Sequence, residues 1–169
     1  MTEYRDVICC VQGRNKFDAI REVVDHCSVF ENLLNKDRFI EAVIQRELVE
    51  STGIGRGVAI AHGKVRDVGR IRVGLGLSQT GIDYQASDGK PVHLLFVIGS
   101  SPYRQVEYLK TLAAIMRFVK VTDVREELIS HAGDADFSDE KEQRCLDFLH
   151  MMAEQHFATF FDIKFRSHL

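Results

Sequence analysis

The sequence predicts a single α/β domain in which a mixed β-sheet is flanked by helices on both faces. Three observations support this prediction. Segments with apolar residues at helical spacing recur along the chain, and short apolar or alternating segments typical of strands lie between them. The run over 92–99 is almost entirely apolar, which is typical of a central strand covered on both faces. The chain has 169 residues, of which 45% are apolar and 28% charged, as expected for one globular domain.

The N-terminal part is predicted to form one strand and two amphipathic helices. Residues 6–12 (DVICCVQ) are a β-branched and cysteine-rich run that suits a strand. Apolar residues over 16–27 form one helical face, and the same spacing returns over 35–50. Asn35 or Asp37 is placed to cap the second helix.

The middle of the chain is predicted to supply most of the sheet. Three glycines at alternate positions in 51–57 favour neither helix nor strand, so we expect irregular structure there. A short apolar strand is expected over 58–61. Residues 68–79 alternate large apolar residues with glycine, serine or arginine, which predicts a strand with one small or basic face. Turn residues over 87–91 separate it from the buried run at 92–99.

The C-terminal third is predicted to be mostly helical. Apolar residues at helical spacing extend over 103–119, where Ser101 can cap the helix and Pro102 can take its first position. Further helices are expected over 122–131 and 139–157. The unusually aromatic end of the chain is expected to form an extra tail that packs on the domain or offers a surface to a partner.

The charge pattern argues against nucleic acids and membranes as partners. The formal net charge is -3, and no basic run is interleaved with aromatic residues. No apolar run approaches the length of a membrane span, and the N-terminus lacks the features of a secretion signal. We therefore expect a cytoplasmic protein that neither binds nucleic acid nor inserts into a membrane.

The cysteines and histidines lack the spacing of a metal site. Cys9, Cys10, Cys27 and Cys145 form no C-x-x-C pair, and the seven histidines are scattered without an H-E-x-x-H pair. We expect buried free thiols, no metal and no cofactor.

The segment 51–63, STGIGRGVAIAHG, could be read as a nucleotide-binding loop. It follows a predicted helix with the spacing G-x-G-x-G, whereas a dinucleotide fingerprint follows a strand. Gly63-Lys64 is followed by Val65, so the triphosphate loop is not matched either. Two interpretations remain. The glycines permit a tight path to the strand, with His62 as a satisfied polar residue, or they admit another molecule to a nucleophilic His62 exposed at the strand end.

Residues 46–65, RELVESTGIGRGVAIAHGKV, closely resemble the active-site signature of the type-2 IIA domains. These belong to the fructose, mannitol and nitrogen-regulatory branch of the bacterial phosphoenolpyruvate phosphotransferase system. The similarity continues through GIDY at 81–84, DGKPV at 88–92 and VEYLKTL at 106–112. The resemblance implies a mixed sheet flanked by helices. Residues 1–169 would then form one such domain, with a core of about 6–157 and the tail at 158–169.

The resemblance also implies roles for particular residues. His62 matches the family's phosphoryl acceptor, which receives the group from the phosphohistidine of a small carrier protein, HPr or its nitrogen-branch relative. Neutral imidazole is a competent nucleophile near pH 7. Arg46 matches the cation that neutralises the phosphoryl oxygens, and its planar guanidinium suits phosphate. Further donors for phosphate are expected at Ser51, Thr52, Gly53 and Gly55.

Two positions depart from the family pattern. Ala61 stands where proline usually precedes the active histidine, and alanine fixes the backbone less. Tyr108 stands where the family commonly has a second histidine. Its hydroxyl can donate a hydrogen bond to phosphate but carries no positive charge, and an aromatic side chain packed on the sheet is the alternative interpretation. His93, on the predicted central strand, is expected to be a core histidine.

The implied function is that of a phosphocarrier IIA protein of the nitrogen-regulatory kind. The resemblance implies an HPr-like carrier as its donor, and a regulatory protein or the IIB part of a sugar permease as its target. The alternative is a regulatory binding module that keeps the fold but is not phosphorylated, which Ala61 and Tyr108 motivate. A nucleotide-binding protein is a third hypothesis.

Overall fold

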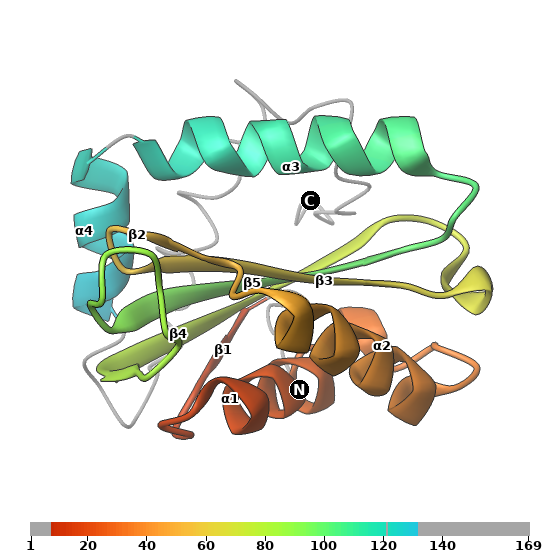
Figure 1. Ribbon diagram of the computed structural model, residues 1–169, viewed down its shortest axis with the longest axis horizontal. Helices are drawn as coiled ribbons and strands as arrows, with labels where there is room; N and C mark the ends of the chain where they lie inside the picture. The colour runs from red at the N-terminus through yellow and green to blue at the C-terminus, as the bar shows by residue number, and fades with distance from the viewer. Residues whose placement is uncertain (1–7, 121, 132–169) are drawn as a thin grey trace, which may run out of the picture.

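The computed structural model describes residues 8–120 and 122–131, which form a five-stranded sheet between helices (Figure 1). The strands are β1 (Ile8–Cys10), β2 (Gly53–Gly55), β3 (Val58–Lys64), β4 (Arg72–Ile82) and β5 (Val92–Ser100). The helices are α1 (Lys16–His26), α2 (Lys36–Val49), α3 (Gln105–Lys120) and α4 (Thr122–His131), with short 3-10 helices η2 (Ser28–Phe30) and η3 (Arg66–Val68).

The sheet is mixed, and β5 lies at its centre. The strand order is β1-β4-β5-β3-β2. β4 runs parallel to β1 and antiparallel to β5, whereas β3 runs parallel to β5 and antiparallel to β2. α1 and α2 cover one face, and α3 covers the other (Figure 1). The predicted mixed sheet with helices on both faces is therefore confirmed, as is the central strand predicted over 92–99.

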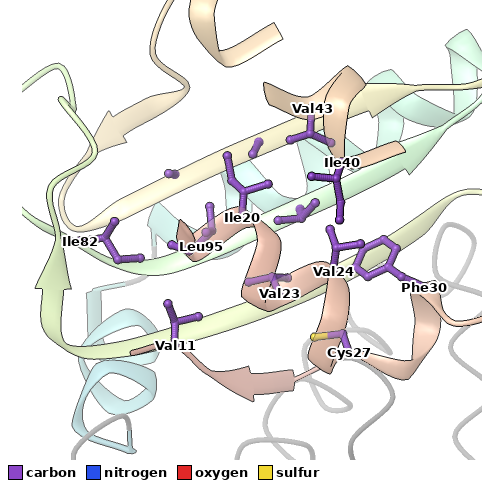
Figure 2. Packing of buried hydrophobic residues seen from close by; sticks show 14 of the residues in the cluster. Val11, Ile20, Val23, Val24, Cys27, Phe30, Ile40, Val43, Ile82 and Leu95 are labelled. Atoms are coloured by element: carbon purple, nitrogen blue, oxygen red, sulfur yellow. The ribbon is translucent and has the colours of Figure 1, made fainter. Parts of the chain in front are cut away.

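The face of the sheet toward α1 and α2 is covered by a continuous apolar cluster (Figure 2). Ile20 of α1 and Val43 of α2 pack in it with Leu95 of β5. Phe30 of η2 stacks on Phe39 of α2, with their ring centroids 5.4 Å apart. The helical spacing in the sequence predicts most of the buried apolar side chains of α1 and α2, but Leu48, which it places on the apolar face of α2, is 60% exposed.

β4 alternates large and small residues because helix α1 packs closely on one of its faces. A Cβ atom on Gly76 would lie 2.6 Å from side-chain atoms of both Val11 and Val23. The neighbouring Leu75 belongs to the cluster on the opposite face, beneath α3. The predicted alternation is confirmed, although the strand begins at Arg72 and not at residue 68.

Asparagine caps the start of α2. The Arg38 backbone N–H donates to Asn35 Oδ1 at 2.9 Å, so Asn35 and not Asp37 is the cap. Asn15 caps α1 in the same way through the backbone N–H of Asp18.

The predicted start of α3 is wrong. The Arg104 N–H donates to the carbonyl of Ser101 at 3.1 Å, which closes a turn, and the helix begins only at Gln105. Pro102 therefore lies in the turn and not at the first helical position. The chain leaves β5 at Ser100 in the plane of the sheet, and the turn carries it to the layer above (Figure 1).

The glycine-rich segment contains a short strand where the sequence predicts irregular structure. β2 pairs with the start of β3 through a turn in which Gly55, Arg56 and Gly57 have φ values of 88°, 57° and 77°. Glycine adopts these positive φ values without a steric cost. A Cβ atom on Gly53 would lie 2.8 Å from Cα of Ala86, so close packing selects glycine there.

β3 continues three residues beyond its predicted end at Ala61. It pairs with β5 from Val58 to Lys64, so the hydrogen bonds of the neighbouring strand extend it. His62 therefore lies inside a strand and not at the strand end that the sequence predicts.

Some predictions fall outside the described residues. These are the helix at 139–157 and the aromatic tail at 158–169. None of the described helices combines the length and the apolar composition needed to traverse a bilayer.

We predict that Gly76→Ala destabilises the fold, because the added methyl group overlaps Val11 and Val23. The free energy of unfolding should fall by about 1–3 kcal/mol in urea denaturation. Gln79→Ala, at an exposed position of the same strand, should change it by less than about 0.5 kcal/mol. Equal effects of the two substitutions would contradict the close packing of α1 on β4.

Candidate functional site

His62 projects from β3 toward α3. Side chains alternate between the faces of a strand, and Val58 and Ile60 of β3 belong to the cluster on the α3 side. Ala61 and Gly63 consequently face α2, where a Cβ atom on Gly63 would lie 2.8 Å from the Val43 side chain. The small residues on either side of His62 thus allow α2 to pack against the strand.

His62 also lies at an open edge of the sheet. β2 pairs with β3 only at Val58 and Ala59, with one further hydrogen bond from the Ile60 N–H to the carbonyl of Thr52 at 3.1 Å. Beyond that point β3 has β5 on one side and, among residues 8–120 and 122–131, no strand on the other. The half-buried His62 is therefore reachable from this edge.

Tyr108 of α3 packs against His62. Their ring centroids are 5.2 Å apart and the ring planes are tilted by 46°. The Tyr108 side chain is buried, and burial raises the pKa of its hydroxyl. The hydroxyl is therefore protonated near pH 7 and is able to donate a hydrogen bond. The structure brings Tyr108 to the histidine, as the sequence predicts.

Arg46 reaches the same place from the last turn of α2. Its Nη1 donates to the carbonyl of Glu50 at 2.9 Å. Its positive charge adds to the burial that lowers the pKa of His62, and it partly offsets the burial that raises the pKa of Tyr108. The structure thus brings together the three residues His62, Arg46 and Tyr108, which come from three separate elements.

The environment of His62 favours its neutral form. Burial is the largest cause of its lowered pKa, and the charges of Arg46 and Lys64 act in the same direction. A weak contact with the backbone of Ile60 and the charge of Glu47 act in the opposite direction. Since the folded chain releases this proton more readily than the unfolded chain, His62 contributes stability above its ordinary pKa of about 6.5, and that contribution is lost as the pH falls.

The two ring nitrogens of His62 have different surroundings. Nδ1 is buried and makes no hydrogen bond within the part of the chain that the structure describes. Nε2 is not among the buried polar atoms that lack a partner. A neutral ring protonated on Nδ1 presents its lone pair at Nε2, which makes Nε2 the candidate nitrogen for attack.

A buried carboxylate that sequence reasoning missed lies directly beside Arg46. Glu47 is 1% exposed and accepts hydrogen bonds from the Thr52 N–H at 2.9 Å and from the Thr52 hydroxyl. The Tyr84 hydroxyl donates to it at 3.2 Å, and Lys16 Nζ lies 3.6 Å from its Oε1. Its charge and that of Arg46 both influence the pKa of His62. The sequence signal that could have found it is its place next to Arg46 in the segment that resembles the family signature.

The four predicted phosphate-binding residues extend away from His62 along the start of β2. The Ser51 hydroxyl donates to the carbonyl of Tyr84 at 2.9 Å and accepts from the Gly53 N–H at 3.2 Å. The donors of Thr52 are taken by Glu47. Gly55 pairs with Val58 at the far end of β2. Phosphate binding by these residues stays a prediction.

The remaining histidine of the sheet lies apart from this site. His93 is half-buried near the start of β5, where its Nδ1 lies 2.8 Å from the carbonyl of Ser78. His62 pairs with Ile98, five residues further along the same strand.

Over residues 8–120 and 122–131, no three His, Cys, Asp or Glu side chains are arranged to hold a metal ion.

Comparison with protein families finds one that matches most of the chain. The family described as "Phosphoenolpyruvate-dependent sugar phosphotransferase system, EIIA 2" matches residues 1–140. The fructose-specific EIIABC component of Bacillus subtilis is 30% identical over 119 residues, which are 70% of this chain and 19% of that protein. The nitrogen regulatory protein of Bradyrhizobium diazoefficiens is 33% identical over 94 residues, 56% of this chain and 61% of that protein. The chain thus spans less than two thirds of the length of either relative.

Solved structures share the fold. The nitrogen regulatory protein IIA-Ntr of Neisseria meningitidis superposes with a TM-score of 0.71 at 22% identity, over 86% of this chain and 94% of that chain. The IIA mannitol protein of Escherichia coli superposes with a TM-score of 0.61 at 16% identity, over 86% and 98% of the two chains. At these identities the similarity establishes the fold alone.

We predict that Arg46→Gln raises the pKa of His62, because it removes a positive charge that disfavours protonation of the ring. An NMR titration of the His62 imidazole measures this pKa directly. Arg38→Gln, at the exposed start of the same helix, is the matched control and should leave the value unchanged. An unchanged pKa in Arg46→Gln would place the guanidinium outside the site.

We predict that Glu47→Ala destabilises the fold strongly, because Lys16 and the Thr52 N–H lose their buried partner. The expected loss in the free energy of unfolding is about 3–5 kcal/mol, measured by urea denaturation. Glu41→Ala, at an exposed position on the same helix, should change it by less than about 0.5 kcal/mol. Similar losses in both variants would show that the Glu47 contacts contribute little.

Proposed function

The chain belongs to the EIIA 2 family of the phosphoenolpyruvate-dependent sugar phosphotransferase system, and from that premise we propose that it is a phosphocarrier. His62 is the proposed phosphoryl acceptor. The observation that carries the proposal is the position of this histidine, which is half-buried at an open sheet edge beside the charge of Arg46. Its lowered pKa supports the proposal, because only the neutral ring has a lone pair for attack.

The proposed step exchanges one N–P bond for another. Nε2 of His62 attacks the phosphorus of the donor's phosphohistidine, and the donor's N–P bond breaks on the opposite side of the phosphorus. The electron pair of the broken bond stays on the donor imidazole, which takes up a proton, while His62 gives up the proton on Nδ1. Such a transfer depends on in-line positioning and on neutralising the phosphoryl oxygens.

Arg46 is the proposed phosphoryl-binding cation of this step. One arm of its guanidinium is held by the carbonyl of Glu50, and within the described part of the chain no other partner of its N–H groups is seen, so we propose that these bind the phosphoryl oxygens. The protonated hydroxyl of Tyr108 is a proposed further donor. We retain Ser51, Thr52, Gly53 and Gly55 as candidate phosphate-binding residues, although the donors of Ser51, Thr52 and Gly53 would have to exchange internal partners for phosphate.

A small phosphohistidine carrier of the HPr type is the proposed donor. Exposed apolar side chains occur on both helices that contribute to the site, as protein docking would require. Leu48 and Val49 end α2, and Val106 and Leu109 are at the start of α3. A carrier that covered them would bring its own histidine to the open edge of β3.

We assign the protein to the nitrogen-regulatory kind and to the cytoplasm, where such carriers operate. Relatives named as fructose components and relatives named as nitrogen regulatory proteins both match the chain, so the donor and the next acceptor are the decisive tests. A regulatory protein should take phosphate faster from the nitrogen-branch carrier than from HPr, and should not pass it to a IIB domain. Rapid transfer to a IIB domain would instead identify a sugar component.

We predict that phosphoenolpyruvate, enzyme I and the cognate carrier add one acid-labile phosphoryl group to the protein, and that His62→Ala abolishes this labelling. His26→Ala, at an exposed histidine that ends α1, is the control and should be labelled normally. Labelling that persists in His62→Ala would reject the acceptor assignment. A folded wild-type protein that no carrier labels would favour the alternative of a regulatory binding module.

A further inference from the structure

We propose that Lys64 is a second phosphoryl-binding cation of this site and that Tyr108 acts as its support. This inference rests on the proposed function, because it concerns the phosphoryl group on His62. It adds a residue that neither the sequence pattern nor the arrangement of His62, Arg46 and Tyr108 assigns.

Lys64 is placed to reach a group on His62. The two residues are two positions apart on β3, so their side chains leave the same face with Cα atoms about 7 Å apart. The ammonium of Lys64 lies 4.9 Å from the ring centroid of Tyr108, and the same ring lies 5.2 Å from that of His62. One aromatic ring thus contacts both the histidine and the ammonium. The charge of Lys64 already contributes to the lowered pKa of His62.

The site needs a second positive charge. A phosphoryl group carries about two negative charges near pH 7. Tyr108 is neutral at this pH, and Lys16 is paired with Glu47. Arg46 alone would leave the phosphoryl group only partly compensated, and Lys64 supplies the missing charge.

Lys64 is available for this role. Its exposed ammonium donates to the amide oxygen of Gln105 at 2.6 Å, and no carboxylate among residues 8–120 and 122–131 forms a salt bridge with it. A neutral amide can be exchanged for a phosphoryl oxygen without breaking an ion pair. The contact with the Tyr108 ring is a weak cation–π interaction that guides the side chain without fixing it.

Tyr108 is a positioning residue in this proposal, and its ring matters more than its hydroxyl. Tyr108→Phe keeps the aromatic surface under Lys64, whereas Tyr108→Leu removes it. The two variants therefore separate support of the ammonium from hydrogen bonding by the hydroxyl. Lys64 is exposed, so its substitution should leave the fold intact.

The test phosphorylates His62 chemically with phosphoramidate, which requires no carrier. A ³¹P NMR titration then gives the second pKa of the phosphoryl group, and its hydrolysis rate is measured alongside. A nearby ammonium favours the doubly charged phosphoryl group, so Lys64→Gln should raise that pKa and Lys64→Arg should restore it. Tyr108→Leu, which removes both the ring and the hydroxyl, should raise it by more than Tyr108→Phe, which removes only the hydroxyl.

The second readout is the rate of transfer from a saturating concentration of the carrier. Lys64→Gln should slow it by about tenfold, the effect of losing one hydrogen bond between charged groups. Lys90→Gln makes the same change in net charge in the loop before β5 and should match the wild type. Arg46, Glu47 and the backbone of Ile60, which also act on His62, are the same in all these variants.

The outcomes separate this inference from the proposed function. If the wild type is phosphorylated on His62 but Lys64→Gln changes neither the phosphoryl pKa nor the transfer rate, the role of Lys64 is wrong and the phosphocarrier stands. A pKa change in Tyr108→Phe as large as in Lys64→Gln would assign the effect to the tyrosine hydroxyl. If neither phosphoramidate nor any carrier phosphorylates His62, both proposals fall.

Discussion

The buried carboxylate of Glu47 is the constraint on which the arrangement of the site depends. A charge that is 1% exposed is tolerated only where hydrogen bonds and an opposite charge replace water. Here Lys16 of α1, Thr52 before β2 and Tyr84 after β4 supply them. The end of α2 is thereby held against three other segments, and Arg46, one residue earlier, is directed to the sheet edge beside His62.

A phosphoryl acceptor must be buried enough to stay neutral and exposed enough to meet a partner protein. The position of His62 at the edge of the sheet satisfies both conditions. Pairing with β5 and packing against Tyr108 bury Nδ1 and keep the ring neutral. β2 ends its pairing before it reaches the histidine, so the side chain stays only half-buried. A residue deeper in the sheet would be closed to a partner protein, and one on a loop would be solvated and protonated more readily.

The sequence pattern predicted the elements whose buried face follows from their own residue spacing. It failed for elements whose bounds depend on contacts with segments distant in the sequence. The helical faces of α1 and α2 and the apolar run of β5 were predicted because side-chain periodicity reports which face is buried. β2 was missed because its glycine at position 53 is selected by Ala86, and β3 was predicted too short because β5 extends it through His62. The predicted start of α3 was wrong because a turn at Ser101 is needed to carry the chain from the end of β5 to the helical layer above the sheet.

By itself, the sequence determined the fold class and the family resemblance and proposed His62 and Arg46 as site residues, because these inferences depend on periodicity and on a contiguous motif. Only the tertiary structure decided which charges surround the histidine. Glu47 meets Lys16 and Tyr84, and Lys64 meets Tyr108, across separations of more than thirty residues. Such contacts depend on how the helices pack on the sheet, and this packing cannot be inferred from residue spacing or amino-acid composition. The electrostatics of the site are therefore a property of the folded chain.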